Sequence, residues 1–288
     1  MTQLHATTFH EPSVELPRTL FDYNVIEHLG DGAGSSIYAV SHAVTGQLYA
    51  LKHVIRRSER DARYIEQLEN EYEVGRHLIH PGLRKVIDLR YVRKLFKTHE
   101  AALIMELVDG TPLDQQMPPK LPDLIEVFIQ AAAALGAMHA AGVVHCDFKP
   151  GNILVASDLS TKVIDLGQAC PVGTVKQRIQ GTPDFISPEQ VKCRPVDPRT
   201  DVFSLGASLY WALAGRRLPT LFTIGRGDNS FLCDSVIPSP HALNPSIPEP
   251  LSNLVMECVR IKPEKRPASM DELVRRLEIM KHVAQRDA

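Results

Sequence analysis

Alternating apolar and polar positions dominate the first third of the chain, a period-two pattern that is typical of half-buried strands. The pattern predicts five strands, over residues 23–29, 36–40, 47–52, 86–92 and 101–108. Between the third and fourth of these, residues 58–78 carry apolar side chains at helical spacing and predict one amphipathic helix. Residues 1–20 contain two prolines and little periodicity, and we expect them to form an N-terminal extension.

The pattern changes in the second part of the chain. Residues 123–141 are apolar on nearly every face, which predicts a helix buried in the middle of a lobe. Further helices are predicted at residues 188–192, 202–214, 251–259 and 270–284. The proline-rich stretch 219–250 is too polar and too long for one helix, and we expect an ordered surface loop with short turns.

Composition and charge describe an ordinary soluble protein. The 288 residues are 44% hydrophobic and 23% charged, and the net charge of -2 gives no general attraction to nucleic acid or to anionic membranes. We expect no membrane-spanning segment and no signal peptide, and therefore a cytoplasmic location. The five cysteines are scattered and odd in number, which argues against a disulfide framework or a zinc site.

A glycine cluster lies between the first two predicted strands. It reads Gly30-Asp31-Gly32-Ala33-Gly34-Ser35. Glycines let a backbone bend tightly and approach a phosphate without an intervening Cβ. Because this loop joins a strand to a strand, it is not the dinucleotide-binding fingerprint, and a glycine-rich hairpin without a ligand is the alternative.

Lys52 ends the third predicted strand, at a half-buried position. A lysine there needs a carboxylate or a phosphate to offset its desolvation. Glu71 on the amphipathic helix is placed to be that partner, and Glu73, on a different face, is the competitor. The alternative is an exposed lysine whose stem covers apolar surface.

The densest group of polar residues follows the buried helix. Asp147, Lys149, Asn152 and Asp165 all lie among apolar flanks that should be buried. Buried charges rarely lack partners, and the partner that fits this set is a metal-bound phosphate chain. Asn152 and Asp165 offer the hard oxygen ligands that Mg²⁺ prefers, Asp147 can accept a hydroxyl proton, and Lys149 can neutralise a phosphoryl group. A satisfied structural loop is the alternative.

In this order and spacing, these segments resemble the bacterial eukaryotic-like serine/threonine protein kinases, from about Tyr23 to Val283. The resemblance extends to the segment Gly181–Glu189, which is similar to the substrate-docking end of an activation segment. It also includes the segment Asp201–Gly206 and Arg266, which follow in the expected order.

The resemblance implies an α+β, bilobal protein-kinase fold over residues 21–284, with ATP between the lobes. A small five-stranded N-lobe with one helix (21–107) would lead through a hinge (106–110) into a larger, mainly helical C-lobe (111–284). The implied ATP-binding residues are the glycine loop (Gly30, Asp31, Gly32, Ala33, Gly34, Ser35), Ile37, Ala50, Lys52, the gatekeeper Met105, the hinge residues Glu106 to Val108, and Leu154. Ordinary core packing is the alternative for the apolar members.

The same resemblance assigns the remaining roles. Asp147, Lys149, Lys52 and Glu71 would be catalytic, and Asn152 and Asp165 would bind Mg²⁺. Thr182 would lie in the docking segment, and Glu189 would pair with Arg266. Asp201 would brace the catalytic loop, residues 144–154. The implied activity is transfer of the ATP γ-phosphoryl group to serine or threonine hydroxyls of protein substrates. An ATP-binding pseudokinase and a kinase of small molecules are the alternatives.

Cys146 departs from the family pattern, because regulated kinases carry there an arginine that pairs with a phosphorylated activation-segment residue. A neutral thiol cannot make that pair. We therefore expect activity not to depend strongly on phosphorylation of Thr174, the one Ser or Thr between Gly167 and Gly181. A redox role for Cys146 is an alternative to a buried structural thiol, although no neighbouring motif lowers its pKa.

Three further departures concern the N-lobe and the metal-binding motif. Leu166 replaces the usual phenylalanine and leaves Asp165 in place. Ser35 replaces the third loop glycine, and Gly34 at the tip predicts a more mobile loop. Gly75 lies inside the predicted helix at a cost of about 1 kcal/mol relative to alanine, and it predicts a looser Lys52–Glu71 pair.

Overall fold

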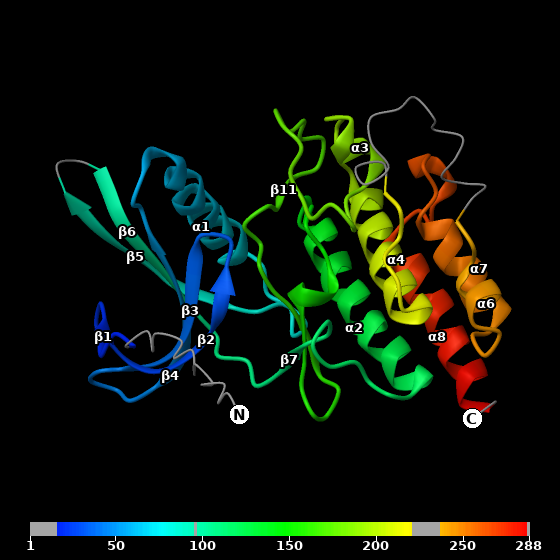
Figure 1. Cartoon of the computed structure of the whole chain (residues 1–288), viewed down its shortest axis with the longest axis horizontal. Helices are drawn as coiled ribbons and strands as arrows, with labels where there is room; N and C mark the ends of the chain where they lie inside the picture. Colours follow the sequence, from blue (N-terminus) through cyan, green and yellow to red (C-terminus); the bar gives the residue numbers. More distant parts are fainter. Residues whose placement is uncertain (1–15, 95–96, 221–236, 287–288) are drawn as a thin grey trace, which may run out of the picture.

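The structure is a computed structural model and describes residues 16–94, 97–220 and 237–286. Within these ranges the chain forms two lobes, a mainly β N-lobe and a mainly helical C-lobe, that lie side by side (Figure 1). The predicted bilobal α+β architecture is confirmed. Most of the predicted N-terminal extension (1–15) and part of the proline-rich stretch (221–236) lie outside the described residues.

The N-lobe contains one antiparallel sheet in the order β1-β2-β3-β4-β6-β5. The strands are β1 (Thr19–Leu20), β2 (Tyr23–Gly32), β3 (Ser35–His42), β4 (Leu48–Ile55), β5 (Val86–Lys94) and β6 (Lys97–Met105). In the described residues the sheet therefore has six strands, one more than predicted. The additional strand, β1, has two residues and is too short to show an alternating pattern, so we had placed it in the extension.

Helix α1 (Ala62–Gly75), preceded by the 3-10 turn η1 (Glu59–Asp61), covers one face of this sheet (Figure 1). On β6, Leu103 and Met105 pack with α1, whereas Ile104 packs on the opposite face. The same alternation on β4 places Lys52 on the face that α1 covers, together with Ala50 and Val54. The strand period thus directs the Lys52 side chain toward α1.

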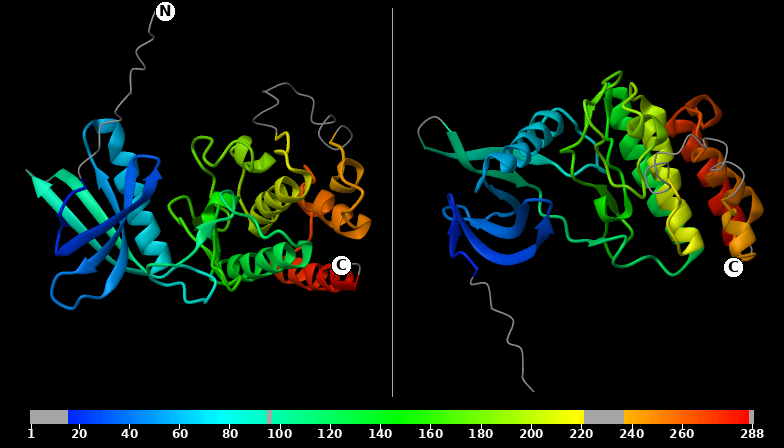
Figure 2. Two further views of the ribbon diagram at one scale, coloured as in Figure 1. Left: turned by 60° about the horizontal axis from the view of Figure 1, so that its bottom comes forward. Right: turned by 45° about the horizontal axis from the view of Figure 1, so that its top comes forward.

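The C-lobe is built around α2 (Leu121–Ala140), which packs against α4 (Pro198–Ala214) and lies beside α8 (Met270–Arg286) (Figure 2). The other helical elements are η2 (Pro150–Asn152), α3 (Pro188–Val191), α6 (Pro240–Leu243), α7 (Glu249–Cys258) and η3 (Pro263–Lys265). All five predicted C-lobe helices are present. Helix α4 begins four residues earlier than predicted, because the Asp197 side chain caps its N-terminus and Pro198 fits the first turn.

Helix α2 has the length and hydropathy of a membrane-spanning helix, with a mean hydropathy of 1.4 over its best window. No such stretch was expected from the sequence. In the fold, Phe128, Leu135 and Met138 of this helix are fully buried in the C-lobe core. A helix at the centre of a core is apolar on most faces, which accounts for the hydropathy of α2.

Two short sheets, which the sequence pattern did not predict, hold the loops at the junction of the lobes. One contains β10 (Thr161–Val163), β9 (Ile153–Val155) and β7 (Thr111–Pro112), and the other pairs β8 (Val143–Val144) with β11 (Cys170–Pro171). Strands of two or three residues carry no readable period. The predicted polar residues Asp147, Lys149, Asn152 and Asp165 lie in the segments that connect these strands.

Candidate active site

A cleft of about 760 Å³ is lined by residues of both lobes. From the predicted site it is lined by Gly30, Asp31, Gly32, Ala33, Ser35, Ile37, Ala50, Lys52, Val108, Asp147, Lys149, Asn152, Leu154 and Asp165. Gly34, Met105 and Glu106 were predicted to contact the nucleotide but do not line the cleft. Met105 is fully buried in the core between α1 and the sheet, and the Glu106 carboxylate binds Lys162, with an N–O distance of 2.9 Å.

The glycine loop forms the tight connection between β2 and β3, where Gly32 pairs with Ser35. Gly34 has a φ of +79°, and a Cβ at this position would overlap the ring of Tyr64 on α1. Glycine is therefore required both by the backbone conformation and by the close approach to Tyr64. We predicted a mobile tip from this glycine; the structure instead packs the tip against α1.

Lys52 bridges α1 and the C-lobe. Its Nζ atom lies 2.7 Å from Oε2 of Glu71 and 3.0 Å from Oδ1 of Asp165. Glu71 is buried on the same helix face as Leu68, whereas Glu73 is exposed and pairs with Arg76. The structure thus selects Glu71 over the competing Glu73 as the partner of Lys52.

The charges of this cluster support one another. Burial opposes the charged form of Lys52, but the Glu71 and Asp165 carboxylates raise the Lys52 pKa above its ordinary value. Burial likewise opposes ionisation of Asp165, yet Lys52 holds the pKa of that carboxyl below its ordinary range. We predicted that Gly75 would loosen the Lys52–Glu71 pair, and the structure does not show this. Gly75 is the last residue of α1 and packs closely against Val86 of β5.

Asp147, Lys149 and Thr182 form a second cluster at the C-lobe side of the cleft. Oδ1 of Asp147 accepts hydrogen bonds from the backbone N–H and from the hydroxyl of Thr182, both at 2.8 Å. Lys149 donates to the same hydroxyl at 3.1 Å, and its Nζ lies 3.8 Å from Oδ2 of Asp147. Thr182 therefore fixes one carboxylate oxygen of Asp147, while Oδ2 faces the cationic Lys149.

Asn152 and Asp165 offer oxygen atoms that fit Mg²⁺. The Asn152 amide nitrogen donates to the Asp147 carbonyl at 2.9 Å, which leaves the side-chain oxygen available for a ligand. On Asp165, Lys52 takes Oδ1, and Oδ2 accepts no hydrogen bond from the described residues. An amide and a carboxylate oxygen are hard ligands, and Mg²⁺ ordinarily completes its shell with waters and phosphate oxygens.

The hinge offers free backbone groups to a flat ligand. The N–H of Glu106 donates to the Lys85 carbonyl at 2.9 Å, but the Glu106 carbonyl and the Val108 N–H make no hydrogen bond within the described ranges. Ile37, Ala50 and Leu154 line the cleft near this segment. An acceptor, a donor and apolar side chains form a suitable surface for a purine base.

Asp201, at the N-terminal end of α4, fixes the backbone of the catalytic loop. Its fully buried carboxylate accepts hydrogen bonds from the backbone N–H groups of His145 (2.8 Å) and Cys146 (3.0 Å), and it pairs with His139 at 2.8 Å. Burial raises the carboxyl pKa, but these donors, His139 first, keep the Asp201 pKa below its ordinary value. Asp147 follows directly after this anchored segment.

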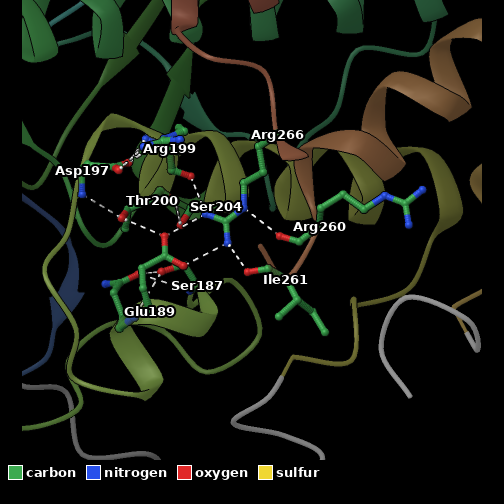
Figure 3. A network of polar contacts seen from close by, with 10 residues as sticks. Ser187, Glu189, Asp197, Arg199, Thr200, Ser204, Arg260, Ile261 and Arg266 are labelled. Carbon is green, nitrogen blue, oxygen red and sulfur yellow. Dashed lines mark hydrogen bonds and ion pairs between the residues drawn. The ribbon is translucent and has the colours of Figure 1, made fainter. Parts of the chain in front are cut away.

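Glu189 and Arg266 form a buried, two-pronged ion pair, with N–O distances of 2.8 and 2.9 Å (Figure 3). The Thr200 hydroxyl donates to the same carboxylate at 2.9 Å. Arg266 also donates to the carbonyls of Arg199, Arg260 and Ile261. The pair joins the segment that carries Thr182 to the helical body of the C-lobe.

Several residues around the cleft were missed by the sequence analysis. Asn70, next to Glu71 on α1, donates from its amide to the carbonyls of Leu166, Gly167 and Ala169. Asp114 lines the cleft next to Gly151, and Arg84 lines it within electrostatic reach of Glu71 and Asp165. Only Asn70 had a readable signal, because it neighbours a predicted site residue on the same helix.

Comparison with known proteins agrees with this geometry. The family model described as protein kinase domain matches residues 23–278. Serine/threonine-protein kinase PknA of Mycobacterium tuberculosis is 32% identical over 82% of this chain and 55% of its own length. A probable serine/threonine-protein kinase of Clostridium acetobutylicum is 26% identical over 90% of this chain and 40% of its own.

The DNA damage-responsive serine/threonine-protein kinase RqkA of Deinococcus radiodurans is 28% identical over 86% of this chain and 38% of its own length. The chain thus spans about half or less of the length of these relatives. The match of the family model over most of the chain, together with the cleft between the lobes, shows that the chain belongs to the protein kinase family.

Proposed function

We propose that this chain is a serine/threonine protein kinase that transfers the γ-phosphoryl group of ATP to protein hydroxyls. The observation that carries the proposal is the arrangement around Asp147. One carboxylate oxygen is fixed by Thr182, and Lys149 lies next to the other. This leaves Oδ2 to orient a substrate hydroxyl and to receive its proton as the oxygen attacks phosphorus.

The remaining groups supply position and charge. Lys52, held by Glu71, would bind the phosphates of ATP, and Lys149 would neutralise charge on the transferring group. Asn152 and Asp165 would hold Mg²⁺, which bridges phosphate oxygens and offsets their charge when bound. The free backbone groups at Glu106 and Val108 would receive the adenine ring.

We further propose that activity does not depend strongly on phosphorylation of Thr174. Position 146 carries a thiol in place of the arginine that binds the phosphate in regulated kinases, and this thiol is buried. Contacts other than a phosphate already position the activation segment. These are Asn70 with three backbone carbonyls, Thr182 with Asp147, and Gln190 with the Cys146 carbonyl at 2.7 Å.

The test is transfer of labelled γ-phosphate from Mg-ATP to a serine- and threonine-containing peptide mixture, followed by phosphoamino-acid analysis. We expect phosphoserine or phosphothreonine, loss of transfer with EDTA and recovery with Mg²⁺. ATP binding without transfer would instead indicate a pseudokinase, and labelling of small molecules alone would indicate a different substrate class. A cytoplasmic location belongs to the same proposal and is checked by fractionation.

A further inference from the structure

Two thiols from different parts of the active-site loops lie in contact. Cys146 precedes Asp147 in the catalytic loop, and Cys170 lies in β11 at the start of the activation segment. Their Sγ atoms are 3.5 Å apart and share a hydrogen bond. Strand β11 pairs with β8 through Cys170 and Val144, so the backbone ladder itself brings the two segments together.

The thiol pair lies in a small apolar cluster of its own. Cys146 and Cys170 are buried with Val144 and Val196. Cys146 has a left-handed backbone conformation, with a φ of +65°, and both of its peptide groups are fixed, since Asp201 binds its N–H and Gln190 its carbonyl. A disulfide has an S–S distance of about 2.05 Å, so the sulfurs need to approach by a short side-chain movement while the backbone remains fixed.

The two thiols differ in acidity. The hydrogen bond shared with the Cys146 thiol and the nearby Lys176 ammonium lower the pKa of Cys170, against the opposing effect of burial. Lys176 is held near it by a 2.8 Å hydrogen bond to the Gln168 carbonyl. The same shared hydrogen bond, together with burial, raises the pKa of Cys146. Cys170 is therefore the nucleophilic member of the pair, and Cys146 is placed to resolve it.

We propose that Cys146 and Cys170 are a reversible disulfide site that a hydroperoxide oxidises. The Cys170 thiolate attacks one peroxide oxygen, the O–O bond breaks, and the products are a sulfenic acid and, with hydrogen peroxide, hydroxide. The Cys146 sulfur then attacks the sulfenic sulfur, the S–O bond breaks, and water leaves with the Cys146 proton. Overall, two thiols and one hydrogen peroxide give one disulfide and two waters.

The crosslink would enclose the active site within a covalent loop. Asp147, Lys149, Asn152 and Asp165 all lie between the two cysteines in the sequence. Because the sulfurs already touch while the Lys52–Glu71 and Asp147–Thr182 contacts are formed, the oxidised chain retains this arrangement. The disulfide joins the catalytic loop to the activation segment without a phosphate, and it removes unfolded conformations of the loop between them.

The bond is tested on the full chain, treated with hydrogen peroxide, alkylated under denaturing conditions and mapped by mass spectrometry without reductant. We expect a linked pair of peptides containing residues 146 and 170, loss of two alkylatable thiols, and their full recovery with dithiothreitol. Cys146→Ser and Cys170→Ser should each abolish the linked peptide, whereas Cys193→Ser and Cys258→Ser should leave it unchanged. Sulfinic acid on Cys170 with Cys146 still alkylatable, or a different cysteine pair, would overturn the proposal.

The structural consequence is tested without the variants, by comparing the oxidised and reduced wild-type chains. Oxidation should raise the midpoint of thermal unfolding and slow protease cleavage between residues 171 and 181. A lower midpoint or faster cleavage would overturn the proposal that the disulfide stabilises these loops. The expectation that the oxidised chain retains transfer activity rests on the proposed kinase function. The mass spectra and the unfolding midpoints do not depend on that function. Failure of the disulfide proposal can therefore be told apart from failure of the kinase proposal.

Discussion

The Asp147 carboxylate and the Thr182 hydroxyl lie 2.8 Å apart, although 35 residues separate them in the sequence. Thr182 also donates its backbone N–H to the same oxygen. The activation segment and the catalytic loop are thereby joined at the group that we propose receives the substrate proton. A displaced activation segment would leave this carboxylate free to rotate.

Replacing Thr182 by valine should lower kcat about 10- to 100-fold, because a hydrogen bond to a charged group contributes about 1.5–3 kcal/mol. Thr182→Ser, which keeps the hydroxyl, should retain most of the rate. Steady-state phosphate transfer at saturating ATP measures both variants. Equal activity of the valine and serine variants would show that the hydroxyl does not orient Asp147.

Replacing Glu71 by glutamine should lower the transfer rate at least about tenfold, because Lys52 loses its buried charged partner and keeps only Asp165. Glu73→Gln is the matched control on the same helix. Glu73 is 59% exposed and should change the rate less than about twofold. Similar losses in both variants, measured side by side, would argue against the assigned ion pair.

Replacing Arg266 by methionine should lower the free energy of unfolding by about 3–5 kcal/mol, because the Glu189 charge would remain buried without its cation. Denaturant unfolding monitored by circular dichroism measures this change. Arg199→Met removes an ion pair to Asp197 that is about one-third exposed, and it should cost less than about 1 kcal/mol. An Arg266 variant as stable as this control would contradict the prediction.

Replacing Thr174 by alanine should keep the transfer rate within about threefold of wild type, because position 146 carries a thiol in place of the arginine that would bind a phosphate there. The Thr174 hydroxyl donates to the Pro171 carbonyl at 2.6 Å, and it also interacts with the Cys170 thiol. The assay should use protein freed of phosphate by a phosphatase. A fall of several orders of magnitude would show that phosphorylation controls this kinase.

Most of the fold could be predicted from the sequence, because long strands and helices show a clear period of apolar positions. Strands β2 to β6 and helices α2, α4 and α8 were all predicted from alternation or from apolar helical faces. Short elements were not predictable in this way, since β1, β8 and β11 have two residues each. These short strands form only because the folded lobes bring their partners into reach.

The site residues on long elements could be predicted to lie together, whereas contacts between loop residues could not. Lys52 and Glu71 could be paired from the sequence, because the strand and helix periods direct both side chains into one interface. The neighbours of Cys146 could not, because nothing in the local sequence places Cys170 beside it. Contacts between loops depend on tertiary structure, and the sequence pattern has no period there to read.

The most direct test of the account compares wild type with Asp147→Asn in two assays, labelled phosphate transfer to peptide and binding of Mg-ATP. The account predicts that the variant loses transfer by several orders of magnitude and binds nucleotide as wild type does, because Asp147 acts on the acceptor hydroxyl and not on ATP. Undiminished transfer by the variant would contradict it, and so would absence of transfer by wild type that binds ATP.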